Sequence, residues 1–189
     1  MRANIPPKHP VQTYIGSKRR GCYPCLHCVN CQFMIKGDKF IHPISGALSE
    51  IRQFLTCDFA VYVLTCPCGL LYVGETTCDM NTRLNNHTFT IRRKRRDLPV
   101  PKHLTEAGHK EKDLRFMILD QVQMPRRGGD RTLTLKKREL YWIYRLQTLR
   151  PVGLNVEFSV VSYRHPFDLG GWYAHLIPLG TSPGTSPDT

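Results

Sequence analysis

The fold is decided by residues 59–73, which read FAVYVLTCPCGLLYV. Both ends of this stretch are rich in aromatic and β-branched side chains, which favour β-strands. Between them stands Cys66-Pro67-Cys68-Gly69, and a proline followed closely by a glycine is typical of a tight turn. The stretch therefore predicts a β-hairpin with Tyr62 and Tyr72 on paired strands, where both rings would also suit an ordinary aromatic core.

An amphipathic helix is expected directly after the hairpin. Apolar residues recur from Met80 to Ile91 at the spacing of a helical stripe. Arg83 and His87 stand one turn apart on the same flank of that helix, where both could face one phosphate.

A second long helix is expected over about residues 135–149. Glu139 lies in phase with its apolar stripe rather than on the solvated side. Burying an ionised carboxylate without a partner costs several kcal/mol, so something must offset that cost. A salt bridge with Arg138 or Arg145, protonation, or a divalent cation would each do so. Beyond the helix a turn delivers a polar Asn155.

A shorter helix is expected over residues 101–108, flanked by His103 and His109. Together with Cys66 and Cys68 these histidines have the donor chemistry of a zinc site. Spacing alone leaves an equal alternative, in which they are surface histidines and reduced thiols.

The first of three predicted regions, residues 1–57, is a basic, cysteine-rich segment. Four of its cysteines are spaced three residues apart and a fifth precedes the hairpin, whereas one tetrahedral zinc site takes four ligands. The favoured ligand set is Cys25, Cys28, Cys31 and Cys57, with Cys22 as the alternate. Reduced thiols, or a local site made from the first four cysteines, are the alternatives.

The charge of the chain points to a polyanion as partner. Lys and Arg number 27 and Asp and Glu 15, so the formal net charge is 27 − 15 = +12. Such an excess favours nucleic acid over an acidic membrane surface. A run of five cations extends the first helix and is expected to contact DNA phosphates, although a solvated face is the usual alternative. The run comprises Arg92, Arg93, Lys94, Arg95 and Arg96.

The remaining composition bears on organisation and location. The first twenty residues are polar, and no apolar run approaches the roughly 18 residues of a membrane helix. We therefore expect neither secretion nor a membrane, and the basic clusters favour the nucleus. Residues 58–157 hold most of the apolar periodicity, and residues 158–189 form an extension predicted to be largely disordered at its end.

The order of these residues resembles the GIY-YIG nuclease family. The matching features are Ala60-Val61-Tyr62, Tyr72-Val73-Gly74, Arg83 with His87, Glu139 and Asn155. Ala60 stands where the family normally has glycine, and Glu75 stands where many relatives have lysine.

Further motifs resemble the endonuclease domain of Penelope-like retroelements over about residues 22–160. They are the Cys66-Pro67-Cys68-Gly69 insertion, Arg127-Gly128-Gly129-Asp130, the helix Arg138-Glu139-Leu140-Tyr141-Trp142-Ile143, and Gly153-Leu154-Asn155. The resemblance implies that Cys66, Cys68, His103 and His109 form a zinc-finger-like set.

This resemblance implies an α+β fold, with a small three-stranded antiparallel sheet flanked by helices, and one DNA-cleaving site. Glu139 would hold Mg²⁺ or Mn²⁺, and Arg83 would bind the scissile phosphate. Tyr62, with a lowered pKa, would be the base, and Tyr72 would orient water or phosphate. His87 would hydrogen-bond the phosphate or the base, and Asn155 would be a positioning residue.

The function expected from this resemblance is nicking of target DNA to prime insertion of the element, with reverse transcriptase and element RNA as possible partners. Two other classes stay open. One is a catalytically inactive, zinc-stabilised nucleic-acid-binding module derived from such an element, and the other is a cysteine-rich protein-interaction domain.

Overall fold

The predicted β-hairpin is present. The computed structural model describes residues 21–24, 29–51, 58–124 and 128–156. Strands β3 (Ala60–Thr65) and β4 (Leu71–Thr76) pair antiparallel, with Tyr62 opposite Gly74. Gly69 closes the turn with a φ of +89°, a left-handed conformation that glycine adopts without steric cost.

A third strand completes the sheet. Strand β5 (Arg115–Gln121) pairs antiparallel with the other edge of β3, so the order is β4-β3-β5. β5 is not among the elements predicted from the residues, because its continuously apolar run suits a strand and a buried helix equally. The sheet and the helices around it confirm the α+β class.

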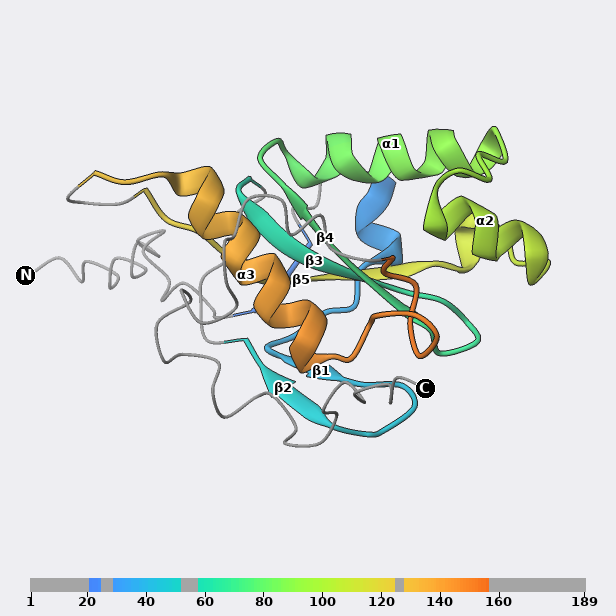
Figure 1. Ribbon diagram of the computed structural model, residues 1–189, viewed down its shortest axis with the longest axis horizontal. Helices are drawn as coiled ribbons and strands as arrows, with labels where there is room; N and C mark the ends of the chain where they lie inside the picture. Colours follow the sequence, from blue (N-terminus) through green and yellow to red (C-terminus); the bar gives the residue numbers. More distant parts are fainter. Residues whose placement is uncertain (1–20, 25–28, 52–57, 125–127, 157–189) are drawn as a thin grey trace, which may run out of the picture.

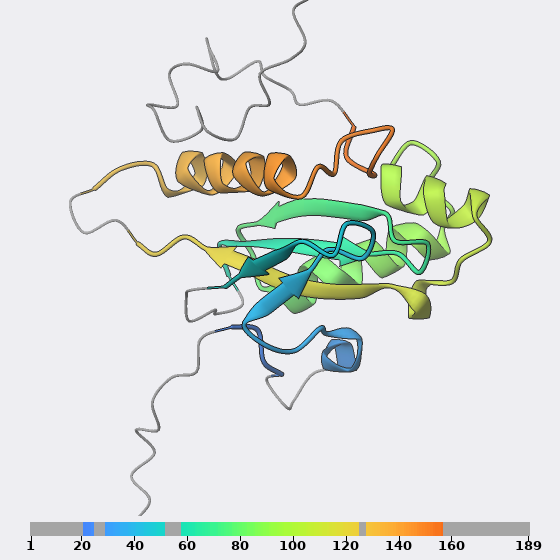
Figure 2. The ribbon, with the colours of Figure 1, turned by 90° about the horizontal axis from the view of Figure 1, so that it is seen from below.

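Helices cover both faces of this sheet (Figures 1 and 2). α3 (Arg131–Arg145) lies on one face and α1 (Met80–Arg92) on the other, while α2 (Pro99–Glu106) packs against α1 at the end of the sheet where the hairpin turns. Within the described ranges, no helix has the length and apolar character needed to cross a membrane.

The helices are those that the sequence predicts, with shifted ends. α3 begins four residues earlier than expected because the Asp130 side chain caps it, accepting a hydrogen bond from the Leu133 N–H at 2.9 Å. It ends before Gln147, whose φ of +50° leaves the helical region. α2 begins at Pro99 rather than Pro101, and a proline suits the first helical turn.

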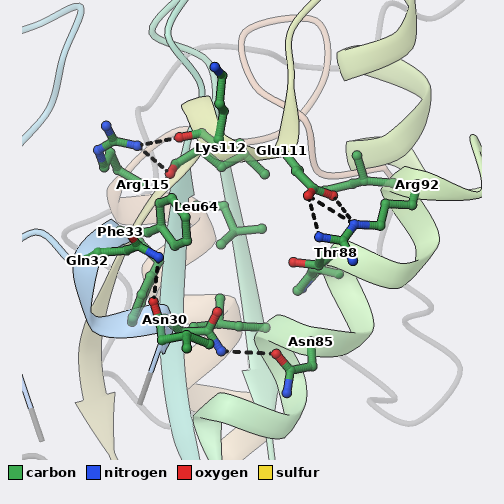
Figure 3. Close-up of a pocket in the computed structure, with 16 residues that line it drawn as sticks. Asn30, Gln32, Phe33, Leu64, Asn85, Thr88, Arg92, Glu111, Lys112 and Arg115 are labelled. Atoms are coloured by element: carbon green, nitrogen blue, oxygen red, sulfur yellow. Dashed lines mark hydrogen bonds and ion pairs between the residues drawn. The ribbon is translucent and has the colours of Figure 1, made fainter. Parts of the chain in front are cut away.

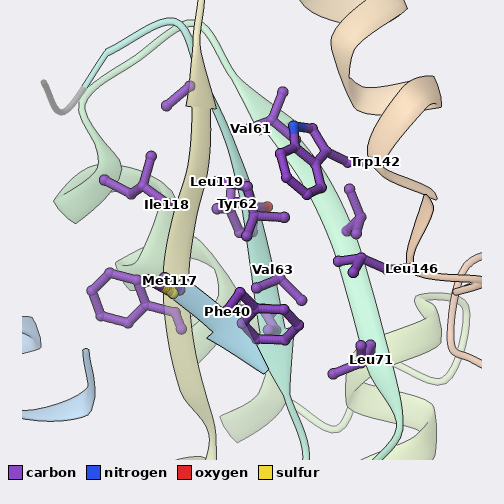
Figure 4. Packing of buried hydrophobic residues seen from close by; sticks show 14 of the residues in the cluster. Phe40, Val61, Tyr62, Val63, Leu71, Met117, Ile118, Leu119, Trp142 and Leu146 are labelled. Carbon is purple, nitrogen blue, oxygen red and sulfur yellow. The ribbon is translucent and has the colours of Figure 1, made fainter. Parts of the chain in front are cut away.

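Part of the hydrophobic core lies between the sheet and α3 (Figure 4). Side chains alternate along β3, so Val61 and Val63 face α3 while Tyr62 faces α1. Trp142 of α3 and Leu146, the residue that follows α3, are buried against the two valines, with exposed fractions of 6% and 2%. This alternation determines which residues of the hairpin can meet residues of α1.

The described part of the N-terminal segment packs on the same core. It contains η1 (Val29–Phe33) and a small hairpin of β1 (Lys39–Ile41) and β2 (Leu48–Glu50). Phe40 of β1 is buried in the core, and the Ile35 N–H donates to a carbonyl of β5 at 2.7 Å. Residues on either side of the predicted boundary at 57 therefore share one hydrophobic cluster.

Asn155 occupies the outer edge of β4. Its side-chain oxygen accepts from the Val73 N–H at 2.9 Å, and its side-chain nitrogen donates to the Val73 carbonyl at 2.8 Å. The Leu154 N–H donates to the Leu71 carbonyl at 2.9 Å. The amide of Asn155 thus takes the place of a neighbouring strand, because it offers the same donor and acceptor pair as a peptide group.

Replacing Asn155 by alanine should destabilise the protein, because the buried peptide groups of Val73 would lose both hydrogen bonds. We expect a loss of about 3 kcal/mol in the free energy of unfolding, measured by urea denaturation. Asn86→Ala, an exposed change on α1, is the matched control. Equal urea midpoints for the two variants would contradict this role of Asn155.

Candidate active site

The hydroxyl group of Tyr62 is the centre of a polar cluster between β3 and α1. Tyr62 is fully buried. Arg83 donates from Nε to the Tyr62 oxygen at 2.8 Å, and His87 Nε2 lies 2.7 Å from the same oxygen. The predicted one-turn spacing of Arg83 and His87 thus places both side chains on one phenol oxygen.

The protons of this cluster can be assigned from its chemistry. Burial and the positive charge of Arg83 lower the pKa of His87 to about 4, so the imidazole is neutral at neutral pH. A buried hydroxyl proton needs an acceptor, and Arg83 can only donate. We therefore assign the Tyr62 O–H as donor to His87 Nε2.

The expectation of a lowered pKa for Tyr62 is wrong for the protein alone. Burial raises the pKa of Tyr62 far above its usual value, and the nearby Arg83 offsets only part of this effect. The reason is that a phenolate in the core would lose most of its hydration.

Gly74, the last residue of the second tyrosine motif, lies opposite Tyr62 and leaves room for its ring. A Cβ atom at this position would lie 2.6 Å from the Tyr62 oxygen and 2.8 Å from Cζ of that ring. Any side chain on β4 here would push Tyr62 away from its partners, so the hydroxyl cluster requires glycine at this position.

Tyr72 lines a small cavity beside the cluster. It points to the same face of the sheet as Tyr62, and its ring meets His87 edge-on with centroids 5.9 Å apart. The cavity has a volume of about 130 Å³ and is also bounded by Arg83 and by residues 98–101 at the start of α2. Burial raises the pKa of Tyr72 as well.

Glu139 reaches the same region from the other side of β4. The backbone of Glu75 in β4 hydrogen-bonds the Glu139 side chain. Burial and the negative charge of Glu75 raise the pKa of Glu139 to about 7, while Arg83 acts in the opposite direction. Arg83 thus lies close enough to influence both Tyr62 and Glu139, and β4, an edge strand, is where groups from the two faces meet.

The two salt bridges considered for Glu139 do not form. Arg138 pairs with Asp120 of β5 instead, at 3.4 Å, and Trp142 donates from Nε1 to the same carboxylate at 3.3 Å. Glu139 forms no ion pair with any described residue, Arg145 included. The backbone hydrogen bond from Glu75 and the charges of Arg83 and Lys136 offset only part of its burial, and protonation or a bound cation would offset the rest.

Glu75 also belongs to this site. In the sequence it stands out only as a departure from the family pattern. The alternation of side chains along β4 was the available signal, because the residue after Gly74 points toward α3 and its Glu139. Hydrogen bonds and a ring contact bring Tyr62, Tyr72, Arg83 and His87 together, and Glu139 lies near enough to raise the pKa of both tyrosines, whereas Asn155 acts on the backbone of β4.

The predicted set of Cys66, Cys68, His103 and His109 comes together in space. One ligand atom from each side chain lies within 4.8 Å of all the others. Each of the two sulfur atoms is 3.2 Å from His103 Nε2. Ligand atoms about 3.5 Å apart are what a tetrahedral ion with bonds of roughly 2.0–2.3 Å requires.

The donor set fits a metal ion on a second observation. His109 Nε2 is buried without a hydrogen-bond partner. A buried ring nitrogen left unsatisfied is rare, and metal coordination is one way to satisfy it. The group could therefore hold a metal ion, which would join α2 to the turn of the hairpin.

The other cysteine set cannot be placed as a group. Cys25, Cys28 and Cys57 lie outside the described residues, as does the extension 158–189. Cys31 is partly exposed near η1, and Cys22 is buried, where its sulfur accepts a hydrogen bond from the Ile118 N–H at 3.4 Å. The N-terminal zinc site remains a prediction.

The basic run at the end of α1 is fully exposed but partly neutralised. Arg92 makes a forked ion pair with Glu111, at 2.6 Å, and Arg95 pairs with Asp97 at 2.6 Å. Arg93 lies over the ring of Phe89, 4.6 Å from its centroid. The run therefore offers less net charge to a phosphate backbone than its sequence suggests.

Comparison with models of protein families, with curated proteins and with solved structures finds no match to this chain.

The stability of the protein should depend on the ionisation of Glu139. A raised carboxyl pKa means that the folded state binds the proton more tightly than the unfolded state. The stabilising contribution is therefore complete below pH 4.5 and is lost as the pH rises through about 7. Glu139→Gln, which stays neutral, should exceed the wild type by on the order of 2 kcal/mol at pH 8 and match it at low pH.

Urea denaturation at a series of pH values, without added divalent cation, measures this difference. Glu106→Gln, a change at an exposed position on α2, should follow the wild type at every pH. If the free energies of unfolding of wild type and Glu139→Gln change in parallel with pH, ionisation of Glu139 does not destabilise the folded protein.

Proposed function

We propose that this chain is a metal-dependent endonuclease that nicks DNA, acting as a GIY-YIG-type nuclease of a Penelope-like retroelement. The observation that carries the proposal is the convergence of Arg83, the Tyr62–His87 pair and Glu139 on one edge strand. In phosphodiester hydrolysis a cation can bind the phosphate, a proton acceptor can take up the proton of the attacking water, and a carboxylate can hold a metal ion.

Arg83 is the phosphate-binding group in this proposal. Its Nε donates to Tyr62, which holds the guanidinium in place, and its remaining N–H donors are on Nη1 and Nη2, on the side chain that also hydrogen-bonds Tyr72. A planar, permanently charged fork suits two oxygens of one phosphate. The cavity beside Tyr72 lies next to Arg83 and gives the reacting phosphate or water a place to approach.

Tyr62 and His87 would handle the proton together. Since His87 is neutral above about pH 4, its Nε2 can accept the Tyr62 proton when the phenol oxygen accepts one from the attacking water. This pairing avoids a buried phenolate, which the raised pKa of Tyr62 makes unfavourable. Tyr72, at the wall of the cavity, would orient that water.

Glu139, with Glu75 beside it, would hold the divalent cation. Carboxylate oxygens are the preferred ligands of Mg²⁺ and of Mn²⁺, and Glu139 has no competing ion pair among the described residues. When bound, such a cation neutralises charge that develops on the phosphate oxygens.

Zinc is the metal proposed for Cys66, Cys68, His103 and His109, because two thiolates and two imidazoles form a closed tetrahedral set. Its role would be structural. The ion would fix α2, whose first turn forms a wall of the cavity beside Tyr72.

The biological setting rests on sequence resemblance alone. We propose target DNA as substrate, with nicking that primes insertion, reverse transcriptase and element RNA as further partners, and a nuclear location. A second candidate, an inactive nucleic-acid-binding module, is favoured by three exposed cations just after α1 that have no acidic partner among the described residues, Arg93, Lys94 and Arg96.

Relaxation of supercoiled plasmid with Mg²⁺ tests the proposal. Wild type should produce nicked circles, and Glu139→Gln and Arg83→Gln should each lower the rate by at least about 100-fold. Glu106→Gln and Arg145→Gln remove the same charges from exposed positions and should keep the wild-type rate.

The two candidate functions give different results in this assay. Nicking that is equal in wild type and Glu139→Gln would reject the catalytic role of the carboxylate. Salt-sensitive DNA binding without nicks at any Mg²⁺ or Mn²⁺ concentration would favour the binding module.

Loss of a cluster cysteine should remove zinc and lower stability. Cys68→Ala should bind one equivalent of zinc less than Cys78→Ala, which removes an exposed thiol outside the cluster. If the ion contributes roughly 4 kcal/mol, the melting temperature of Cys68→Ala should fall by about 10 °C. Equal zinc content and equal melting temperatures of these two variants would argue against the site.

A further inference from the structure

A larger cavity lies on the other flank of α1, away from the cavity beside Tyr72 (Figure 3). Its volume is about 370 Å³, within the range of pockets that take small organic ligands. Five elements line it: η1 of the N-terminal segment, β3, α1, η2 (Glu111–Asp113) and β5. None of the catalytic roles proposed above uses this space.

The lining combines an apolar surface with an aromatic ring. Leu64 of β3, Leu84 and Ile91 of α1 contribute aliphatic side chains. Phe33 of η1 is only partly buried and adds its ring from the N-terminal segment. A flat, weakly polar group would find van der Waals contacts on one side and a stacking partner on the other.

The rim of the cavity is positively charged. Arg92, Lys112 and Arg115 line it with a single acid, Glu111, which is occupied by Arg92. Arg115 is fixed by donating from Nη1 to the carbonyls of Lys112 and Leu114, both at 2.9 Å, and its guanidinium lies 5.9 Å from the Phe33 ring centroid. Lys112 and Arg115 are thus left to attract an anion next to the aromatic ring.

His87 connects this cavity to the candidate active site. It lines both cavities, and its Nε2 contacts Tyr62. A DNA strand whose phosphate lies at Arg83 could therefore extend along α1 and bring a neighbouring nucleotide to Phe33.

From this geometry we infer that the cavity binds one unpaired nucleotide of the DNA strand. The base would lie against Phe33 and the aliphatic residues, and its phosphate would face Lys112 and Arg115. A base inside a duplex is stacked and cannot enter, whereas single-stranded DNA is bound through aromatic platforms in basic grooves. The inference rests on the proposed function in naming DNA as the ligand, and it predicts a preference for DNA with unpaired nucleotides near the cut.

Binding measured without cleavage tests the inference. Fluorescence anisotropy would compare a labelled single-stranded oligothymidylate of about 12 nucleotides with a blunt duplex of equal length. All proteins would carry Glu139→Gln and receive no added Mg²⁺, so that neither probe is cut.

The chain offers matched controls for both features of the cavity. Phe33→Leu removes the ring under Arg115, and Phe89→Leu removes an exposed ring under Arg93 outside the cavity. Lys112→Gln removes a rim charge, and Lys39→Gln removes an exposed charge on β1.

Phe33→Leu should weaken single-strand binding by about tenfold and duplex binding by less than about twofold. Lys112→Gln should weaken single-strand binding by roughly threefold or more, and the two controls should affect both probes equally and by less than about twofold. Since Lys112 is exposed, its variant keeps the test valid even where Phe33→Leu lowers stability.

The inference is overturned if Phe33→Leu and Phe89→Leu bind the single strand alike, or if the parent protein that carries Glu139→Gln alone does not bind it. Its failure is separate from that of the nuclease proposal. If plasmid nicking is normal and Phe33→Leu leaves oligonucleotide binding unchanged, only the nucleotide-binding role of the cavity is rejected. If single-strand binding depends on Phe33 but no plasmid is nicked, only the nuclease proposal is rejected.

Discussion

The hydrogen bonds to the Tyr62 hydroxyl group join the sheet to helix α1, and the rest of the site depends on them. Tyr62 can be buried only because Arg83 and His87 satisfy its oxygen, and it can reach them only because Gly74 leaves room on the paired strand. The same bonds fix the guanidinium of Arg83, whose charge lowers the pKa of Glu139. One buried phenol oxygen thus links β3, α1 and the facing position of β4. The two tyrosine motifs are therefore tied to Arg83 and His87, which follow them in the chain.

Much of this arrangement follows from local patterns. The aromatic and β-branched runs around Pro67 and Gly69 specify the hairpin, and the apolar periodicity from Met80 specifies α1 with Arg83 and His87 on one flank. The cluster of Cys66, Cys68, His103 and His109 could be chosen from the sequence only with the help of a family resemblance, because spacing in a chain does not fix the approach of α2 to the hairpin.

The features that were not predicted are those that depend on tertiary packing. β5 has no alternation to mark it, because it is apolar along most of its length. Arg138 pairs with Asp120 of that strand rather than with its neighbour Glu139, and no helical periodicity could distinguish these partners. The raised pKa of Tyr62 is likewise a property of complete burial, which a sequence can suggest but cannot measure. The packing of η1 against α1 creates the larger cavity, and it joins segments separated by about fifty residues.

The side-chain amide of Asn155 has a consequence for self-association. A short sheet with open edges is a template for pairing with another extended chain. In this protein Leu154 and Asn155 occupy the outer side of β4, and Ile35 donates to Phe116 on the outer side of β5. Irregular segments thereby take up backbone groups on both margins of the sheet, so recruitment of a foreign strand would first require their displacement. Residues that lie outside every regular element therefore protect the sheet edges against aggregation.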